Sequence, residues 1–407
     1  MKSTIRIIAI IILASATQAY AQAVPFLNYP VSAQALGMGG VGTAFISDNA
    51  TATIANPAQL GIFSLNAKAN ASTDIAGWLE PGASMDASAI SVGAGLNQFW
   101  KELPFTTVAG IGYSNISYSY VPPGPLSGPY VIPGREIDAS NSLTVALGLD
   151  YFVALGFGYT LKLIHSRDPS YPVNQTGQDL GVILQVPVTK LIRKARETRN
   201  GVKPTFDLSF GYAMRNFGKY VRYPYTPLPT EADLGLSADG GLSSRYAGMT
   251  WHWLSLSWSS EAANAPFRLD SVIEYIGHFA TFSDTAWGYA PRYHPGLGNF
   301  NPWQNLILGK ASATVGLRKG GQIGLAEFIY IRAGSITDAG QTTYSTFGWG
   351  LDLDGLAKCL VFFRWLDPNA PVAKFLLDHL DLQYDYSRAY GGIYQGEPFE
   401  DLNLVVR

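Results

Sequence analysis

The sequence predicts an all-β protein, a transmembrane antiparallel β-barrel of about fourteen strands with an N-terminal plug. Three observations predict it: charged residues are scarce, glycines and aromatic residues are abundant, and apolar residues alternate along the chain. Of 407 residues, 14% are charged and 13% are aromatic, with 43 glycines, whereas soluble domains average about 25% charged residues. A barrel whose outer face meets lipid explains this composition. Composition alone also allows a large secreted β-sandwich.

Residues 1–21 have the pattern of a cleavable secretory signal peptide. Basic residues precede a short apolar run at 7–14, and Ala19 and Ala21 provide the small side chains expected before a cleavage site. The run is shorter than the roughly 20 residues that a membrane-spanning helix needs. Cys359 is the single cysteine, which excludes an intrachain disulfide and an acylated N-terminal cysteine. The sequence therefore predicts export, and in a membrane it predicts a barrel.

The clearest alternation covers residues 143–163. It predicts two strands joined by a tight turn around 150–152, with the bulky apolar side chains at odd-numbered positions. These side chains are Leu143, Val145, Leu147, Leu149, Val153, Leu155, Phe157, Tyr159, Leu161 and Leu163. Small or polar residues occupy the other face, and charge is nearly absent from both. That distribution favours lipid outside the sheet and a crowded lumen inside it.

Strands placed between turn signals number about fourteen, the even number typical of bacterial single-chain barrels. The predicted spans are 62–74, 84–98, 105–119, 139–149, 153–164, 178–188, 204–216, 248–259, 266–277, 306–318, 322–334, 343–354, 379–388 and 398–406. The long connections then gather at one end and the short turns, such as 319–321, at the other, as in outer-membrane barrels. The chain ends in Arg407, whereas such barrels often end in an aromatic residue.

Two helices are predicted on the short-turn side. Residues 188–197 form a basic amphipathic pattern, and residues 371–378 begin with a proline at a helix start. The segment 355–366 fits either a helix or an extension of a strand. Such helices could lie across the barrel rim at the membrane interface, which the basic amphipathic pattern favours, or they could dock a periplasmic partner.

The stretch at 32–62 is rich in glycine and alanine and nearly free of charge, and it separates the signal peptide from the strands. Its small residues let backbone pass close to backbone, so we interpret residues 22–61 as a plug inside the barrel formed by 62–407. The candidate plug residues are Gly37, Gly39, Gly40, Asp48, Asn56 and Pro57. A phosphate-binding loop would need a preceding strand and a following helix, and this stretch has neither.

This stretch also carries a family resemblance. The segments 35–40 (ALGMGG), 48–50 (DNA) and 56–60 (NPAQL) resemble the start of the PorV/PorQ family of outer-membrane proteins, which are related to FadL-type fatty-acid transporters. Gln59 stands where that family usually has glycine. A second segment, 211–218, resembles the family's strand ending in Arg-Asn-Leu-Gly. The resemblance implies a FadL-like barrel with a plug and a role in type IX secretion.

The sequence gives little sign of catalysis. The five histidines lack metal-ligand spacing, Cys359 has no neighbouring histidine, and no Gly-x-Ser-x-Gly motif is present. His252 with Ser255 or Ser257 is conceivable as a pair, although a histidine on the barrel face is the stronger interpretation. Asp381 and Asp385 fall on a predicted lumen face and could pair with basic residues there. We therefore predict no enzyme activity, no metal and no cofactor.

The segment 278–305 is the most aromatic of the predicted outer loops. Its candidate partner-binding residues are Trp287, Tyr289, Arg292, Tyr293 and Trp303. Exposed Trp, Tyr and Arg are the residues that protein interfaces use for binding energy, but the same residues could fold over the barrel mouth as a lid.

Two functions remain open, both in the bacterial outer membrane and in contact with its lipid. One is a type IX secretion component that docks exported or secretion-complex proteins, and the other is a FadL-like channel for hydrophobic small molecules. A net charge of −2 argues against nucleic acid as a partner. A channel should show an apolar pocket beneath the plug and a gap in the wall. A docking protein should show a closed lumen and an aromatic outer crown.

Overall fold

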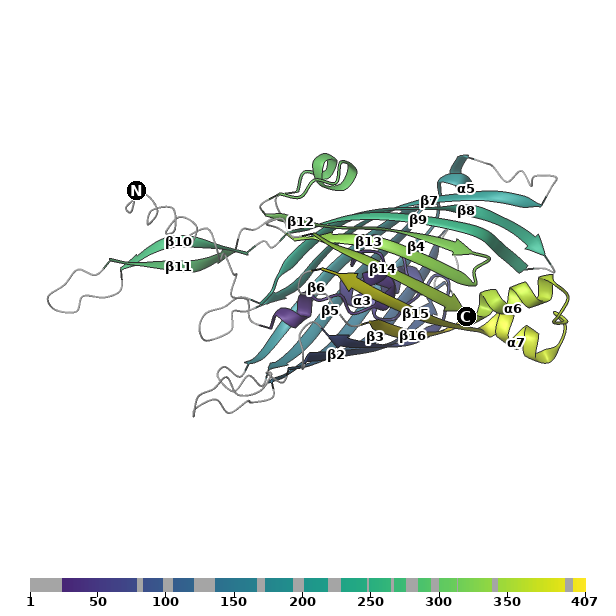
Figure 1. The fold of residues 1–407 in the computed structure, drawn as a ribbon, viewed down its shortest axis with the longest axis horizontal. Coiled ribbons are helices and arrows are strands. Elements are labelled where there is room, and N and C mark those ends of the chain that lie inside the picture. The colour runs from purple at the N-terminus through teal and green to yellow at the C-terminus, as the bar shows by residue number, and fades with distance from the viewer. Residues whose placement is uncertain are drawn as a thin grey trace.

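The computed structural model shows a closed antiparallel β-barrel of fourteen strands with a folded N-terminal segment inside it (Figure 1). It describes residues 24–78, 83–97, 105–120, 136–166, 173–192, 201–218, 228–246, 249–264, 267–275, 285–293, 300–312, 314–338, 343–391 and 398–407. The predicted signal peptide lies outside these residues. In the described residues no helix combines the length and the apolarity that crossing a membrane would require.

The barrel is built in chain order, and each strand pairs with its neighbours in sequence except around one insertion. The first seven strands are β1 (Ala69–Trp78), β2 (Ala83–Gly95), β3 (Thr106–Tyr120), β4 (Glu136–Asp150), β5 (Ala154–Ser166), β6 (Val173–Val186) and β7 (Val202–Gly218). The other seven are β8 (Glu231–Tyr246), β9 (Met249–Asn264), β12 (Val315–Leu325), β13 (Ile329–Thr337), β14 (Thr343–Asp352), β15 (Leu380–Tyr390) and β16 (Phe399–Val406). β9 pairs directly with β12, and β1 pairs with β16 to close the barrel.

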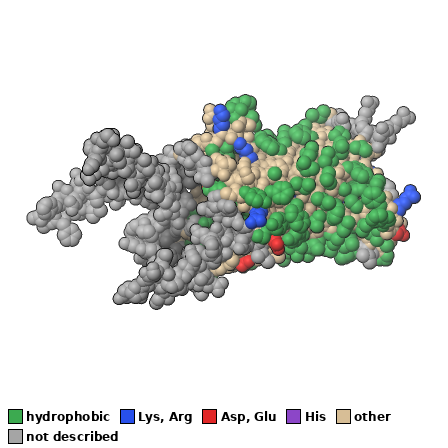
Figure 2. All heavy atoms as spheres, in the orientation of Figure 1, with side chains coloured by type: hydrophobic (Ala, Val, Ile, Leu, Met, Phe, Trp, Pro, Cys, Tyr) green, Lys and Arg blue, Asp and Glu red, His purple; other side chains and the backbone are tan. Residues whose placement is uncertain are grey.

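The alternation read from the sequence on β4 and β5 is confirmed. Their odd-numbered side chains point outward, and Leu143, Phe157 and Leu163 are between 42% and 49% exposed. Their even-numbered neighbours are largely buried against the plug, including Thr144 and Thr160. Bulky apolar residues therefore form the outer surface, and Figure 2 shows them covering much of the barrel wall.

The two ends of the barrel differ, as the sequence predicts. At one end lie α5 (Val188–Ile192), α6 (Leu353–Phe362), α7 (Pro371–His379) and the C-terminus, and we call this the helix end (Figure 1). The opposite end, here the loop end, receives the connections β3–β4, β7–β8 and β9–β12. The connection β9–β12 contains a separate hairpin of β10 (Phe267–Tyr275) and β11 (Thr285–Tyr293), followed by η2 (Trp303–Ile307).

The N-terminal segment occupies the lumen as a series of short helices. These are η1 (Pro25–Asn28), α2 (Ala33–Gly37), α3 (Ala52–Ala55) and α4 (Gln59–Phe63). They pack inside the ring of strands, where Leu36, Met38 and Leu60 are almost completely buried. We call residues 24–67 the plug.

Several predicted strands are corrected by the structure, although their number is right. Of the predicted strand at 266–277, the described residues 267–275 lie outside the barrel because they pair with β11 instead of with β9. The missing barrel strand is β8, which sits in a stretch that the sequence suggests is a loop. Its Gly240-Gly241 pair looks like a turn, yet both glycines lie within the strand and pair with β9. β1 begins at Ala69 rather than at 62 because α4 extends the plug.

The predicted turn at 319–321 is also wrong. These residues lie inside β12, and the turn to β13 falls at Ala326–Phe328 instead. Only glycine fits at position 320, because the plug backbone passes over it. A Cβ there would lie 2.1 Å from the carbonyl oxygen of Met38. Helix α7 is confirmed, with Pro371 in its first turn. The undecided segment 355–366 is largely helix α6, and the predicted helix at 188–197 is described only as far as Ile192.

Candidate functional site: the plug in the barrel lumen

The plug touches the barrel wall backbone to backbone, and glycines make this possible. A Cβ added to Gly148, Gly158, Gly211 or Gly334 would come within 2.4 Å of a plug backbone atom. All four glycines lie on strands, so their missing side chains leave space for the plug. This explains why glycine alternates with large apolar residues in the strands. The inner face of the wall therefore lacks side chains at these glycines, where the plug sits, whereas the outer face carries large ones.

Two of the predicted plug glycines are needed for their backbone conformation. Gly39 and Gly40 have φ values of +78° and +75°, which side chains disfavour. A Cβ on Gly39 would also lie 2.3 Å from the carbonyl oxygen of Lys319. Gly37 is in helix α2 and packs against Arg332 of β13 and Gly348 of β14. The Gly-rich stretch therefore turns the chain while keeping it against β12, β13 and β14.

Asn56 and Pro57 fix the plug to the opposite wall. Asn56 is fully buried, and its side-chain amide donates to the carbonyl oxygen of Thr43 at 2.7 Å and to that of Tyr212 at 3.4 Å. Its side-chain oxygen accepts the backbone N–H of Ala58 at 3.0 Å. Pro57 sits directly over Gly158. One asparagine thus joins two parts of the plug to β7.

Asp48 holds the plug through its backbone. Its carbonyl oxygen accepts hydrogen bonds from the side chains of Asn70 at 2.8 Å and Asn403 at 3.3 Å, on the two strands that close the barrel. The neighbouring plug residues Asn49 and Ser32 both donate to the carboxylate of Asp401 on β16. The plug is therefore tied to the β1–β16 seam.

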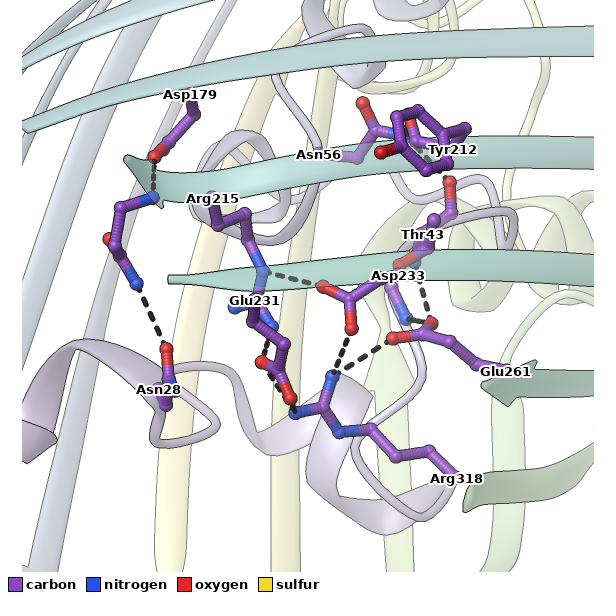
Figure 3. A network of polar contacts seen from close by, with 12 residues as sticks. Asn28, Thr43, Asn56, Asp179, Tyr212, Arg215, Glu231, Asp233, Glu261 and Arg318 are labelled. Carbon is purple, nitrogen blue, oxygen red and sulfur yellow. Dashed lines mark hydrogen bonds and ion pairs between the residues drawn. The ribbon is translucent and has the colours of Figure 1, made fainter. Parts of the chain in front are cut away.

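Five charged side chains form a buried network inside the barrel, shown in Figure 3. Arg318 of β12 binds Glu261 of β9 at 3.0 Å and Glu231 of β8 at 3.1 Å, and it lies 3.4 Å from Asp233. Arg215 of β7 binds Asp233 at 2.7 Å and also contacts Glu231. The network thus holds three carboxyl groups and two guanidinium groups.

The plug backbone also donates hydrogen bonds to this network. The Oε2 atom of Glu261 accepts the backbone N–H groups of Gly42 at 2.9 Å and Thr43 at 2.8 Å. A carboxylate that accepts two backbone N–H groups forms charge-assisted hydrogen bonds, which are stronger than neutral ones. The wall and the plug thus share one network, and moving the plug would leave Glu261 without these donors.

Two further buried ion pairs lie on the inner face of the wall. Lys162 of β5 binds Asp179 of β6 at 2.8 Å and donates to Asn216, which in turn donates to Asn28 of the plug at 2.9 Å. Arg332 of β13 donates to Gln322 at 2.6 Å and forms an ion pair with Asp385.

The expectation that the lumen acids Asp381 and Asp385 pair with basic residues is correct. Asp385 binds Arg332, while Asp381 binds the C-terminal Arg407 at 2.9 Å. The two acids lie four residues apart on β15 and serve different contacts: Asp385 is in the plug region and Asp381 is near the helix end.

Beneath the plug, toward the helix end, lies a chamber of about 820 Å³. The plug residues Phe45 and Asp48 form part of its wall, and the helices contribute Lys190, Asp354 and Lys358. Most of the other lining side chains come from the strands and are polar or charged. The apolar pocket expected beneath the plug of a channel for hydrophobic molecules is therefore not what this chamber offers.

His252 with Ser255 and Ser257 faces the chamber, but the histidine is engaged elsewhere. Its Nδ1 atom contacts the carboxylate of Glu327 in the β12–β13 turn, and Lys358 of α6 contacts the same carboxylate. Burial alone would raise the pKa of Glu327, but the His252 hydrogen bond and the charge of Lys358 outweigh it and lower that pKa to about 2. Within the described ranges no group of three or more His, Cys, Asp or Glu residues is arranged to hold a metal.

The structure divides the predicted partner-binding residues between two elements. Trp287, Tyr289, Arg292 and Tyr293 belong to β11, and their side chains fall outside the described part of the structure. Trp303 begins η2 and is 64% exposed. The segment predicted as an outer loop thus contains strand β11, which pairs with β10 in a hairpin, and partner binding by these residues stays a prediction.

Sequence reasoning missed the central network. Arg215, Glu231, Asp233, Glu261 and Arg318 appear as scattered single charges, since their strands are brought together only by barrel closure. One signal was available: charges inside otherwise alternating, charge-poor strands must face inward and find partners. Arg215 lies in the segment that resembles the family's Arg-Asn strand.

No protein-family model and no curated protein matches the chain. Among solved structures it is similar to the Pseudomonas putida toluene transporter TodX, with 11% identity, 91% of this chain and 96% of that chain covered, and a TM-score of 0.38. It is also similar to Pseudomonas putida OprB, with 8% identity, coverage of 89% and 98%, and a TM-score of 0.33. For the β-domain of the Bordetella autotransporter BrkA the identity is 8%, the coverage 84% and 98%, and the TM-score 0.30.

Proposed function

We propose that this protein is an outer-membrane barrel, exported by the signal peptide at 1–21, that docks exported proteins as a component of type IX secretion. The single observation that carries the docking role is the closed lumen. The plug is held by backbone contacts at wall glycines and by the Glu261–Arg318 network. A barrel closed in this way presents surfaces for partners rather than an open path.

Membrane placement rests on the outer face. Large apolar side chains stay 36–54% exposed on strands all around the barrel, among them Ile111, Leu180, Leu256 and Ile331. A soluble protein rarely exposes so large an apolar surface, whereas lipid covers it without cost. The resemblance of 35–60 to the PorV/PorQ family supports the outer membrane and the secretion role together.

A FadL-like channel for hydrophobic small molecules is the second candidate. It is favoured by the chamber of about 820 Å³ beneath the plug, and a toluene transporter is among the solved structures to which the chain is similar. Transport would require the plug to move, and a hydrophobic molecule would then enter a chamber lined mainly by polar groups. Docking therefore remains the preferred function. We also propose a non-catalytic role, without metal or cofactor.

The test removes aromatic residues from the β10–β11 hairpin. We expect Trp287→Ala with Tyr293→Ala to leave the barrel assembled but to weaken association with an exported protein at least about tenfold, or 1.4 kcal/mol. Truncated interface anchors commonly cost more than this. The measurement is co-purification of partner proteins from detergent-extracted membranes, alongside uptake of a labelled fatty acid or aromatic hydrocarbon.

Phe152→Ala provides the control, since Phe152 is an exposed aromatic residue in the β4–β5 turn at the helix end. It should leave partner association unchanged. If the variant with Trp287→Ala and Tyr293→Ala keeps its protein partners but loses uptake of the labelled molecule, the docking proposal fails and the channel remains as the candidate function.

A further inference from the structure

The helix end carries aromatic side chains that the fold leaves uncovered. Helices α6 and α7 form a hairpin with its own small core of Ala357, Val361, Ala373 and Leu377. Outside that core, Phe363 is 60% exposed, Trp365 79% and Phe375 54%. These three side chains are not needed to hold the two helices together. Their exposure in water would be unfavourable, so the question is what covers them.

The aromatic residues continue onto the barrel wall as a chain of ring contacts. On β9, the rings of Trp251 and Trp253 have centroids 3.9 Å apart, and Phe362 of α6 lies 4.9 Å from Trp251. Phe363 follows at 5.5 Å from Phe362, and Trp365 at 5.7 Å from Phe363. Aromatic residues thus attach the α6–α7 hairpin to the barrel, and aromatic residues are also what this hairpin exposes.

The chain of rings runs along the outer side of the wall. Ser243 and His252 are paired across β8 and β9, and both line the chamber. The next pair, Ser244 and Trp251, must face the opposite side because side chains alternate along strands. Trp251 is only 3% exposed, which fits its position beneath Phe362. Phe362 therefore packs over the outside of the barrel rim.

This outer side is continuous with the exposed apolar side chains of the barrel strands, which we call the belt. Leu254 of β9 pairs with Leu325 of β12, which is 46% exposed. On β14 the outward Leu351 is followed by Leu353 at the start of α6, and both are exposed. Hydrophobic side chains in Figure 2 extend without a charged break toward the helix end. The belt therefore leads directly to the hairpin.

The exposed charges on the hairpin are of both signs, since Arg364, Lys374, Asp367 and Asp378 are all exposed, and the two basic residues are the ones directly beside the exposed aromatic side chains. Arg364 lies between Phe363 and Trp365, and Lys374 precedes Phe375; both basic residues are exposed. The acidic Asp354 is turned the other way and pairs with Lys358 and Arg407 beside the chamber. Aromatic residues beside Lys or Arg are the usual composition of a membrane–water interface, where long basic side chains reach the headgroups.

We propose that the α6–α7 hairpin binds the bilayer leaflet at the helix end, with Phe363, Trp365 and Phe375 inserted at the boundary between headgroups and acyl chains. The inference rests on the membrane placement proposed above. It gives the barrel an anchor outside its strands, at the rim where α6 and α7 pack on β15 and Phe362 of α6 contacts Trp251 of β9. The two helices lie on the membrane surface and do not cross it.

The test measures the depth of single nitroxide labels in the full-length protein. In a Cys359→Ser background, Trp365→Cys and, separately, Phe375→Cys carry the label at the hairpin. Leu256→Cys labels the belt and Ser255→Cys the polar chamber, one residue apart on β9. The protein is reconstituted in vesicles of phosphatidylethanolamine and phosphatidylglycerol, and collisions with oxygen and with a water-soluble nickel complex are compared.

We expect the hairpin labels to be shielded from nickel and accessible to oxygen, at a depth of about 5–10 Å. Hairpin labels as accessible to nickel as Ser255→Cys would overturn the proposal. If they are shielded only in native outer-membrane fragments, a protein partner covers the hairpin instead of lipid, and the proposal also fails. If the Leu256→Cys label is itself water-exposed, the membrane placement fails first, and that result separates the two proposals.

Discussion

At the scale of single residues, the outward and inward faces of each strand obey different rules. Outward side chains are large and apolar, while inward ones are small where the plug touches and charged where networks form. Leu161 lies in the middle of β5 on the outward face and is 39% exposed. Leu155 shares its face but is the second residue of the strand, next to the turn at the helix end.

These two leucines test the membrane placement by depth. We expect Leu161→Arg to destabilise the barrel by about 2–4 kcal/mol, because a cation there would sit near the bilayer midplane. Leu155→Arg should cost only about 0–1 kcal/mol, because an arginine near the rim can reach water. The measurement is urea-induced unfolding in lipid vesicles. Equal costs for both variants would contradict a lipid-covered outer face.

Inward glycines permit a second test at this scale. A Cβ on Gly211 would lie 2.0 Å from the carbonyl oxygen of Thr43, whereas one on Gly240 would meet nothing closer than 3.5 Å. We therefore expect Gly211→Ala to displace the plug and to make its 40–45 segment sensitive to protease. Gly240→Ala, on the neighbouring strand, is the matched control and should leave the plug protected. Equal protection in both variants would mean that the plug is held elsewhere.

At the scale of elements, the β12–β13 turn connects the wall to helix α6. Glu327 in this turn contacts His252 of β9 and Lys358 of α6, and Lys358 also binds Asp354 at 2.9 Å. Gly355 of α6 packs directly on the turn, since a Cβ there would lie 2.1 Å from the carbonyl oxygen of Glu327. The turn thus positions the helical hairpin at the rim.

The charge of Glu327 makes this contact dependent on pH. Its pKa falls from 4.5 to about 2 on folding, so the stabilisation is present above pH 4.5 and is lost as pH falls toward 2. A shift of this size corresponds to about 3 kcal/mol. We expect Glu327→Gln to lower the free energy of unfolding by up to about that amount at pH 7, and wild type and variant to converge near pH 2. A difference that stays constant from pH 7 to pH 2 would show that the carboxylate charge is not its source.

At the scale of the whole molecule, much of the fold could be predicted because large apolar residues on the outer face alternate with small or polar residues on the inner face of each strand. The strands β4 and β5 and the asymmetry of the two ends follow from this alternation. This alternation does not predict β8 and β12 correctly, because the glycines within these two strands resemble the glycines of turns. Their function depends on the plug, which comes from a distant part of the chain.

The same reason limits prediction of the site. The Gly-rich stretch and Asn56-Pro57 are contiguous, so local sequence indicates a compact segment. Glu261 and Arg318 meet because β9 pairs with β12 across the inserted β10–β11 hairpin. That pairing register cannot be read from either strand alone. Single charges in strands indicate inward positions, but their partners appear only when the barrel closes.

The plug depends on the barrel more than the barrel depends on the plug. The strands close through the β1–β16 pairing without any plug residue, with Ala69 opposite Val406 and Ala76 opposite Phe399. Without the plug, water would reach the inward faces and solvate groups such as Glu261 and Arg318. Apolar inward residues such as Met85 and Ile116, now buried against the plug, would become wet. The barrel should then be less stable but still closed as a ring.

We therefore expect deletion of residues 23–58 to leave an assembled but leaky barrel. Assembly is checked by heat-dependent mobility in gels, and leakage by entry of a small hydrophilic dye or antibiotic into cells. Gly240→Ala, which keeps the plug, should be as tight as wild type. An assembled deletion variant with unchanged permeability would show that the loop end, rather than the plug, closes the lumen. In that case the buried network around Glu261 would stabilise the barrel without serving as its seal.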